Sequence, residues 1–258
     1  MKRSALCLLP LDGLPLIEPG QNLGDIIFQT LQALQLKLED ADILVITQKI
    51  VSKAEGRLVN LGEVEPSAKA REIAPICKKD PRLVELILSE SNEIIRLKEN
   101  TLIVEHRLGF ICANAGIDHS NVHGSWGNDE DWYLLLPSNP DQSARLIQDH
   151  LFKRTGKRIG ILIIDSHGRA WRKGTVGITI GLAGVPGIVD MRGKEDLFGF
   201  HLKITQVGAA DELAAAASLV MGQADEMIPI VHVRGFPYPL TDSSLSDILR
   251  EKDEDLFR

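Results

Sequence analysis

Several residue classes are scarce in this chain, and each scarcity excludes a class of protein. The 258 residues contain three cysteines, Cys7, Cys77 and Cys112, and no CxxC pair. This number and spacing exclude a disulfide-rich scaffold and a cysteine-rich zinc site, and they are typical of a reducing compartment. We therefore expect a cytoplasmic protein.

Long hydrophobic runs are also missing. The longest stretch without a charged residue, Gly174–Val189, carries several glycines and Pro186, and it is shorter than the roughly 20 apolar residues of a membrane-spanning helix. The apolar run near the start stops at Asp12, contains Pro10 and is followed by no small-residue cleavage site, so we predict no signal peptide. These patterns predict a protein without a membrane partner.

Positive charge is in the minority. Lysine and arginine number 29 against 36 aspartates and glutamates, which gives a net charge of −7 at pH 7. A surface that neutralises nucleic-acid phosphates is therefore not expected, and we predict no nucleic-acid partner. The remaining composition, 44% hydrophobic and 25% charged, is that of an ordinary globular chain.

The hydrophobic pattern predicts helices and strands that interleave without a regular strand–helix–strand rhythm. This favours an α/β (mixed α+β) fold with a mixed sheet over a doubly wound fold. We expect a polar loop over Asn121–Trp132. Helices are expected over residues 22–38, 67–78, 81–89 and 211–221, from Asn139-Pro140 onward and after Ser243, and strands over 43–47, 101–105, 110–112, 159–164 and 228–233.

The familiar nucleotide-binding and catalytic motifs are absent. The sequence has no GxxxxGK[ST], GxGxxG, HExxH or GxSxG. His119 and His123 stand beside Asp118, but neither a third histidine nor a cysteine pair is near them, so a zinc site is not the favoured interpretation. A nucleotide-dependent enzyme with this sequence would need an unfamiliar phosphate site.

One polar segment follows an apolar run. We expect a strand to end at Asp165, with Ser166 next and a glycine turn after it. Ligands bind beyond the carboxyl ends of strands in open α/β sheets, a carboxylate and a hydroxyl suit Mg²⁺ or Mn²⁺, and Arg169 and Arg172 could neutralise phosphate. A capped turn in which Asp165 satisfies backbone amides, with the arginines paired on the surface, explains the same pattern.

A second carboxylate, Asp118, lies in the small and amide-rich segment Cys112–Val122. Together with Asp165 it could hold metal ions that clamp a transferring phosphoryl group. The alternative is a loop in which Asp118 and its neighbours make their own turn hydrogen bonds. Both interpretations stay open at this point.

Basic residues follow the strand expected at 43–47. Lys49, Lys53 and Arg57 recur at helical spacing, so they could share one face and add positive charge to an anion site at a helix start. The alternative is a solvated basic face with Glu55 as partner. The glycines of Gly174–Val189 allow either close backbone packing, which we favour, or room for a flat ligand or a phosphate.

Taken together, these segments resemble one family. The chain contains, in the order of that family, LPLI, ITQKIVSKAEGR, DPRLVELIL, ICANAGIDHSNV, LLLPSNPDQSA, IDSHGRAWRKGTVGITIGLAG, RGKEDLFG and DELAAAASLVMG. It resembles the coenzyme F(420)-0:γ-glutamyl ligase family from about Leu14 to about Gly235. The resemblance implies an unusual α/β fold, an intertwined homodimer, and a single ligase unit over residues 1–258, as one body or as two intertwined lobes, without an appended flavin reductase domain.

The resemblance also implies an activity. Members of the family use GTP to add L-glutamate to coenzyme F(420)-0, a deazaflavin phospholactate, and release GDP and phosphate, with Mg²⁺ or Mn²⁺ and often K⁺. We expect the reaction to pass through an acyl phosphate. Two alternatives remain: a ligase of the same chemistry on another carboxylate, and a GTP-binding protein without turnover.

Site residues follow from the same motifs. Asp118, Asp165 and Ser166 would bind metal, and Lys53 would act with the two aspartates in catalysis by balancing charge. Ser166 stands where threonine is common, which keeps the hydroxyl, and Gln48 stands where a small hydroxyl residue is common. The resemblance implies GTP contacts from Leu14, Pro15, Leu16, Ile17, Gln48, Lys49, Lys53, Asn121, Leu219, Val220, Met221, Gly222, Gln223, Ala224, Asp225 and Glu226. Candidates for the glutamate site are Arg169, Arg172 and Arg192.

Overall fold

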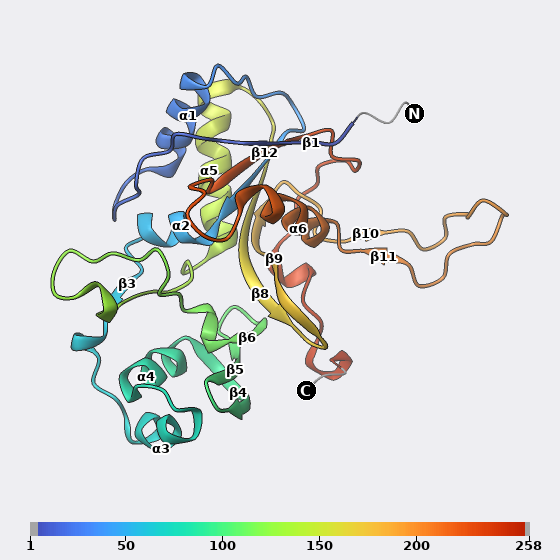
Figure 1. Ribbon diagram of the computed structural model, residues 1–258. Helices are drawn as coiled ribbons and strands as arrows, with labels where there is room; N and C mark the ends of the chain where they lie inside the picture. Colours follow the sequence, from blue (N-terminus) through green and yellow to red (C-terminus); the bar gives the residue numbers. More distant parts are fainter. Residues whose placement is uncertain (1–4, 256–258) are drawn as a thin grey trace.

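The computed structural model describes residues 5–255, and a mixed five-stranded sheet forms its centre (Figure 1). The strand order is β1-β12-β2-β8-β9. Strands β2 and β8 are parallel, whereas the other neighbours are antiparallel, so the predicted mixed α/β fold is confirmed. The strands are β1 (Cys7–Pro10), β12 (Ile230–Arg234), β2 (Ile43–Thr47), β8 (Gly160–Arg169) and β9 (Arg172–Ala183).

Helices cover this sheet and bury its apolar residues. Residues 43–46 of β2 are fully buried. Burial on both faces of the sheet explains why the sequence of this strand is a continuous hydrophobic run. Helix α5 packs on α1, β8 and β9, and α6 packs on β9, β1, β12 and β8. The helices of this main part are α1 (Leu23–Ala33), α2 (Gln48–Ala54), α5 (Pro140–Thr155) and α6 (Ala209–Met221).

A smaller part of the molecule has its own hydrophobic core, which includes Ile73, Val84, Ile87, Leu102 and Val104. It lies below the main sheet in Figure 1. A short pair of strands, β3 (Leu58–Asn60) and β7 (Trp132–Leu134), lies beside it. The smaller part contains α3 (Ala68–Cys77), α4 (Pro81–Ser89) and a sheet of β4 (Ser91–Lys98), β5 (Thr101–His106) and β6 (Ile111–Ala113).

Side-chain caps define the helix starts that the sequence predicts. Asn22, Ser67, Asp80 and Asn139 each accept a hydrogen bond from a backbone N–H of the first turn that follows, which satisfies a donor that the helix leaves free. Helix α1 ends earlier than the predicted residue 38. The helix expected after Ser243 is replaced by two short 3₁₀ turns, Leu245–Asp247 and Lys252–Glu254. Other 3₁₀ turns are Leu61–Glu63, Asn114–Gly116 and Asp129–Asp131.

The prediction that a strand ends at Asp165 is wrong. Strand β8 continues to Arg169 because β9 pairs with it throughout, with Asp165 opposite Ile178 and Ser166 opposite Gly177. Its parallel neighbour β2 does stop here, with Thr47 opposite Ile164. Asp165 and Ser166 therefore extend beyond the carboxyl end of β2 on the β8–β9 hairpin, just after a shift in register between residues 163 and 164.

Close packing explains the glycine-rich segment that becomes β9. A Cβ atom on Gly177 would lie 2.6 Å from the carbonyl oxygen of Ala214 in α6, and one on Gly181 would overlap Pro140 at the start of α5. The favoured interpretation, close backbone packing, is confirmed.

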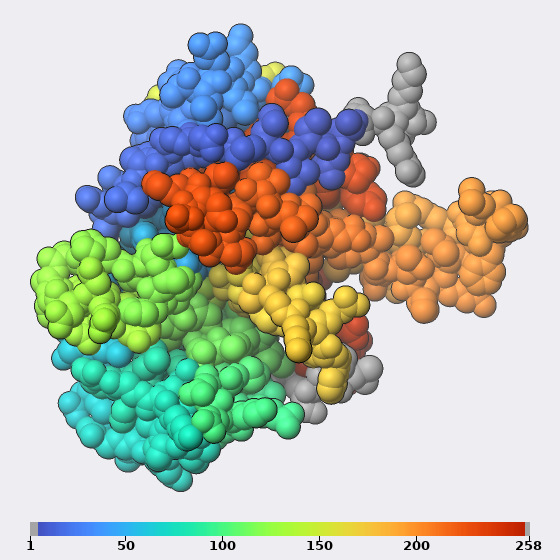
Figure 2. Space-filling model, viewed as in Figure 1, coloured from blue at the N-terminus to red at the C-terminus, as the bar shows by residue number. Residues whose placement is uncertain are grey.

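A narrow arm leaves the body of the molecule after β9. Strands β10 (Val189–Asp190) and β11 (Gln206–Val207) form its base, and the arm projects away from the sheet (Figures 1 and 2). Within residues 5–255, no helix is long and apolar enough to cross a membrane.

Candidate active site

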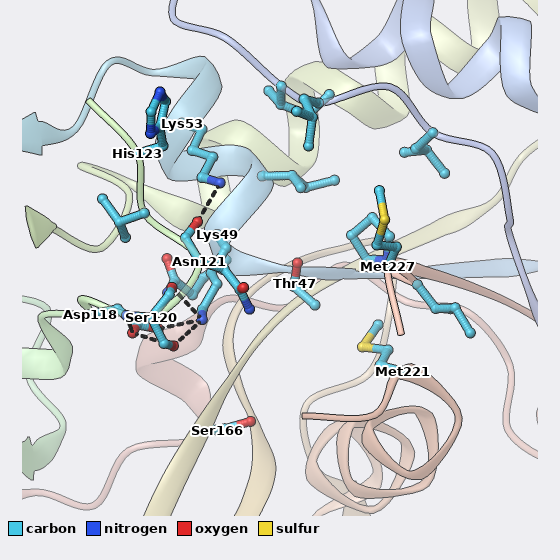
Figure 3. Close-up of a pocket in the computed structure, with 18 of the residues that line it drawn as sticks. Thr47, Lys49, Lys53, Asp118, Ser120, Asn121, His123, Ser166, Met221 and Met227 are labelled. Atoms are coloured by element: carbon cyan, nitrogen blue, oxygen red, sulfur yellow. Dashed lines mark hydrogen bonds and ion pairs between the residues drawn. The ribbon is translucent and has the colours of Figure 1, made fainter. Parts of the chain in front are cut away.

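A large cavity opens where the carboxyl end of β2 meets β8 (Figure 3). Its volume is about 1380 Å³, which exceeds the usual range for a single small-molecule site and leaves room for more than one ligand. Most residues that the resemblance assigns to a site line this one cavity. They are Leu14, Pro15, Leu16, Ile17, Gln48, Lys49, Lys53, Asp118, Asn121, Asp165, Ser166, Met221, Gly222, Gln223, Ala224, Asp225 and Glu226.

Five candidate residues do not line the cavity. Leu219 is 88% exposed, and Val220 packs against the main core. Of the three candidates for the glutamate site, Arg169 donates to the carbonyl of Gly174 at the tip of the β8–β9 hairpin, and Arg192 pairs with an acid on the arm. Arg172 also lies outside the cavity lining.

Helix α2 brings two lysines to the cavity one helical turn apart. The Lys49 Nζ atom lies 2.9 Å from a carboxylate oxygen of Asp118 and donates to the hydroxyl and carbonyl of Ser120. The Lys53 Nζ atom donates to the carbonyl of Asn121 at 2.8 Å. These contacts hold the loop after β6 against α2, as Figure 3 shows.

Burial and the neighbouring Lys49 charge lower the pKa of Lys53, and Asp118 partly opposes this shift. The charged form of an ammonium group is destabilised when the group is desolvated beside a like charge, and an approaching anion stabilises it. The site is therefore prepared for a phosphate or carboxylate ligand.

The third basic residue of the sequence pattern, Arg57, lies elsewhere. Helix α2 ends at Ala54, so the expected three-residue basic face is wrong. Arg57 instead pairs with Glu90 at 2.8 Å and donates to the carbonyl of Leu136. Glu55 is not the partner of the lysines either, because its carboxylate accepts from residues 138 and 143.

The two carboxylates approach the cavity from different parts of the fold. Asp118 follows β6 of the smaller sheet and accepts from the amide and hydroxyl of Ser120, both at 2.9 Å, so the turn interpretation of this segment is also correct. Asp165 extends from β8 of the main sheet, and one of its oxygens lies 2.9 Å from Nε2 of His167. The alternative in which Asp165 caps a turn is wrong, because the strand continues through it.

The cavity lining includes oxygen donors of the kind that magnesium and manganese ions take in proteins. Asp118, Asp165 and Ser166 supply two carboxylates and a hydroxyl to one cavity, whereas no group of three or more His, Cys, Asp and Glu side chains within residues 5–255 could hold a metal alone. Mg²⁺ takes few protein ligands and completes its shell with waters and substrate phosphates. The two histidines near Asp118 have other partners, since His119 contacts the carbonyl of Trp132 and His123 pairs with an acid of its own loop.

A buried aromatic layer lies behind Asp165. The His167 ring packs against Phe110, whose ring stacks on His106 with centroids 5.2 Å apart. Burial raises the pKa of the nearby Cys112 thiol to about 12, and the Asp165 charge adds to this shift. A thiol with this pKa is protonated at neutral pH, so Cys112 acts as core and not as a nucleophile.

Two side-chain contacts tie the loop that follows α6 to the rest of the site. The Asn121 amide donates to the carbonyl of Ala224, and the Ser166 hydroxyl donates to the side chain of Gln223, both at 3.0 Å. Gln48 is almost fully buried, and its Nε2 atom has no hydrogen-bond partner among the described residues. Its Oε1 atom accepts from the Ser52 hydroxyl at 2.9 Å, which fixes the amide within α2.

Sequence reasoning missed several residues of the cavity wall. Three hydroxyl residues from β2, β9 and α6 line the same cavity, namely Thr47, Thr175 and Ser218. Each belongs to a segment whose sequence is typical of a buried strand or helix, so nothing marks it as a site residue. Ser120 could have been found from the sequence. A serine two residues after an aspartate is typical of a turn in which the aspartate side chain accepts a hydrogen bond from the serine backbone N–H.

Comparison with known proteins identifies a family for this chain. The family model described as F420-0:Gamma-glutamyl ligase matches residues 13–235. A protein of Methanothermobacter thermautotrophicus named coenzyme F420:L-glutamate ligase is 45% identical over 255 residues, which cover 98% of this chain and 99% of the relative. Proteins of the same name from Methanococcus maripaludis and Methanocaldococcus jannaschii are 48% and 43% identical, over 86% and 95% of this chain and 86% and 94% of the relatives. The chain therefore belongs to the F420-0:Gamma-glutamyl ligase family.

Proposed function

We propose that this protein uses GTP to join L-glutamate to the terminal carboxylate of coenzyme F420-0 through an acyl phosphate, and releases GDP and phosphate. The observation that best supports the proposal is the convergence of Lys49, Lys53, Asp118, Asp165 and Ser166 on one cavity. Family membership and the names of the relatives support the class of substrate. The volume of the cavity supports simultaneous binding of a nucleotide and an acceptor.

The first step is phosphoryl transfer. A carboxylate oxygen of the acceptor attacks the γ-phosphorus of GTP, the bond to the β–γ bridging oxygen breaks, and GDP leaves. Lys49 and Lys53 balance charge on the phosphates, and Lys53 does so as a desolvated cation. A Mg²⁺ or Mn²⁺ ion held by Asp118, Asp165 and Ser166 would neutralise phosphate charge.

The second step is amide formation. The glutamate nitrogen attacks the carbonyl carbon of the acyl phosphate, the C–O bond to phosphate breaks, and the departing phosphate takes up the proton that the nitrogen loses. No protein nucleophile is needed, so most of the rate gain comes from positioning and electrostatics. The cavity walls would also limit hydrolysis of the acyl phosphate by water.

Assembly as a homodimer is part of the proposal. The arm between β10 and β11 carries large apolar side chains that are almost fully exposed, with Leu197 at 96% and Phe198 at 94%. Exposed apolar groups of this size mark an interaction surface. A second copy of the chain is the proposed partner. K⁺ remains a prediction of the resemblance, with no residue assigned to it.

The experiment is a coupled measurement of phosphate release and product mass. The protein is incubated with GTP, Mn²⁺, L-glutamate and coenzyme F420-0, and each component is omitted in turn. A product heavier by one glutamate that forms only with GTP supports the proposal. Phosphate release without that product indicates another carboxylate acceptor, and GTP binding without either result indicates a binding protein without turnover.

A further inference from the structure

The loop that follows α6 folds back on one of its own carboxylates. An oxygen of Glu226 accepts from the backbone N–H of Ala224 at 2.7 Å. This hydrogen bond, with the nearby amides of residues 226 and 223, lowers the pKa of the Glu226 carboxyl. Backbone N–H groups that converge on one spot form a concave anion site, so we interpret this loop as an anion cradle built from main-chain atoms.

Gly222 makes this cradle accessible. Its φ is +74°, and a Cβ atom on it would overlap the carboxylate of Glu226. Only a residue without a side chain lets an anion lie so close to the backbone here.

The cradle borders the cavity described above. Residues 222–226 line it together with Lys49 and Lys53. Asn121 and Ser166 hold the loop from two other elements through Ala224 and Gln223. Fixed amide dipoles and two lysine charges therefore border one space, the combination that favours a polyphosphate.

We propose that the Glu226 carboxylate is an internal competitor that occupies a phosphate subsite of the nucleotide until the nucleotide displaces it. The inference rests on the proposed function, because it takes the polyphosphate of GTP as the displacing ligand. Glu226 is exposed to solvent, so its side chain can rotate into water without crossing a barrier of buried contacts. The apparent affinity for nucleotide then falls by the fraction of time for which the cradle is filled.

The experiment compares three variants of the full-length chain by isothermal titration calorimetry. Glu226→Ala removes the internal anion, Glu226→Gln keeps its size without its charge, and Glu212→Gln removes an exposed charge of α6 that lies outside the cavity lining. Each variant is titrated with GTP and, separately, with inorganic tripolyphosphate. A thermal melt establishes that each variant is folded.

We expect Glu226→Ala to bind both probes about tenfold more tightly than the unaltered chain, which corresponds to one charge-assisted hydrogen-bond site made free. Glu226→Gln should show a smaller gain, and Glu212→Gln a gain of less than about twofold from general electrostatics. Equal effects of the Glu212→Gln and Glu226→Ala variants, or weaker binding in Glu226→Ala, would overturn the proposal.

The two probes separate this inference from the proposed function. If the unaltered chain binds tripolyphosphate but not GTP, the use of GTP is wrong, whereas a tighter tripolyphosphate complex in Glu226→Ala still supports the competitor. If GTP binds and turns over normally but neither probe responds to Glu226→Ala, only the competitor is wrong.

Discussion

Lys49 and Asp118 form an ion pair of 2.9 Å that joins helix α2 to the loop after β6. One partner is a proposed phosphate contact and the other a proposed metal ligand, and in this structure they neutralise each other. A nucleotide with its metal ion would give each group a new partner of opposite charge. The pair therefore keeps both groups in place without leaving a charge unmatched at the cavity.

Separating the pair by mutation distinguishes the two roles. We expect Lys49→Met to weaken GTP binding about tenfold, because a charge-assisted contact is lost. Asp118→Asn frees Lys49, so binding of GTP without divalent metal should be unchanged or tighter, while turnover falls about a hundredfold or more. Calorimetry and phosphate release measure these quantities. Lys69→Met, an exposed lysine on α3, should change neither.

Asp165→Asn tests the proposed metal site from the other carboxylate. Turnover should fall by about a hundredfold or more, because the ligand charge is lost. The melting temperature should move by only a few degrees, since Asp165 is not part of the hydrophobic core. Binding of Mn²⁺, followed by electron paramagnetic resonance, should weaken. Unchanged Mn²⁺ binding and turnover would reject the assignment, and Asp253→Asn serves as the control.

Glu90 should make stability depend on pH. Burial alone would raise the pKa of Glu90, but hydrogen bonds from Arg57 and Arg107, together with the His106 ring 3.7 Å away, outweigh it and lower the pKa from 4.5 to about 2. The resulting stabilisation is complete above the unfolded pKa and is lost as the pH falls from about 4.5 toward 2.

Replacing Glu90 by glutamine should remove this dependence. A shift of this size corresponds to about 3 kcal/mol, so Glu90→Gln should lower the free energy of unfolding by about that amount at pH 7. Urea unfolding at pH 7 and pH 3 measures it. The exposed pair of Glu99 and Lys78 provides the control, and Glu99→Gln should cost less than about 1 kcal/mol.

The arm should control assembly. Replacing both Leu197 and Phe198 by serine removes the largest exposed apolar groups of the arm, and we expect the double variant to be a monomer by light scattering after size exclusion. Ile76→Ser changes an exposed apolar residue of α3 and should leave the oligomeric state as it is. An unaltered chain that is monomeric at micromolar concentration contradicts the dimer.

Two glycines of the β8–β9 hairpin should respond differently to a methyl group. Gly177→Ala brings a Cβ atom to 2.6 Å from the Ala214 carbonyl oxygen, which belongs to helix backbone and cannot move freely. We expect a loss of about 1–3 kcal/mol in the free energy of unfolding. Gly168→Ala meets no atom within 4 Å and should change stability by less than about 1 kcal/mol.

The elements that the sequence predicts well carry local signals. Strand β2 is a buried β-branched run, and the start of α5 is marked by Asn139 and Pro140. Strand β4 was missed because its polar and half-buried residues show no clean alternation. Its position depends on pairing with β5, and pairing between strands is a tertiary effect that local propensity does not contain.

The candidate site shows the same limit. The types of residue can be predicted from the sequence, since carboxylates, a hydroxyl and lysines are typical of phosphate and metal sites. The sequence does not predict that these residues lie close together, because the contact of Lys49 with Ser120 joins residues 71 positions apart. The resemblance supplied the set of residues, and the structure supplied the pairs within it. The Glu226 contact had no sequence signal at all, because it depends on the backbone conformation at Gly222.

The origin of the two carboxylates has a thermodynamic consequence. Asp118 follows β6 of the smaller part, and Asp165 extends from β8 of the main sheet. An ion that binds both would act as a bridge between the two parts, and it would bind the native arrangement in preference to the unfolded chain. Divalent metal should then raise the melting temperature by mass action. Conversely, if such an ion binds, any rotation between the parts would change the affinity for metal, and flexibility and metal occupancy would be linked.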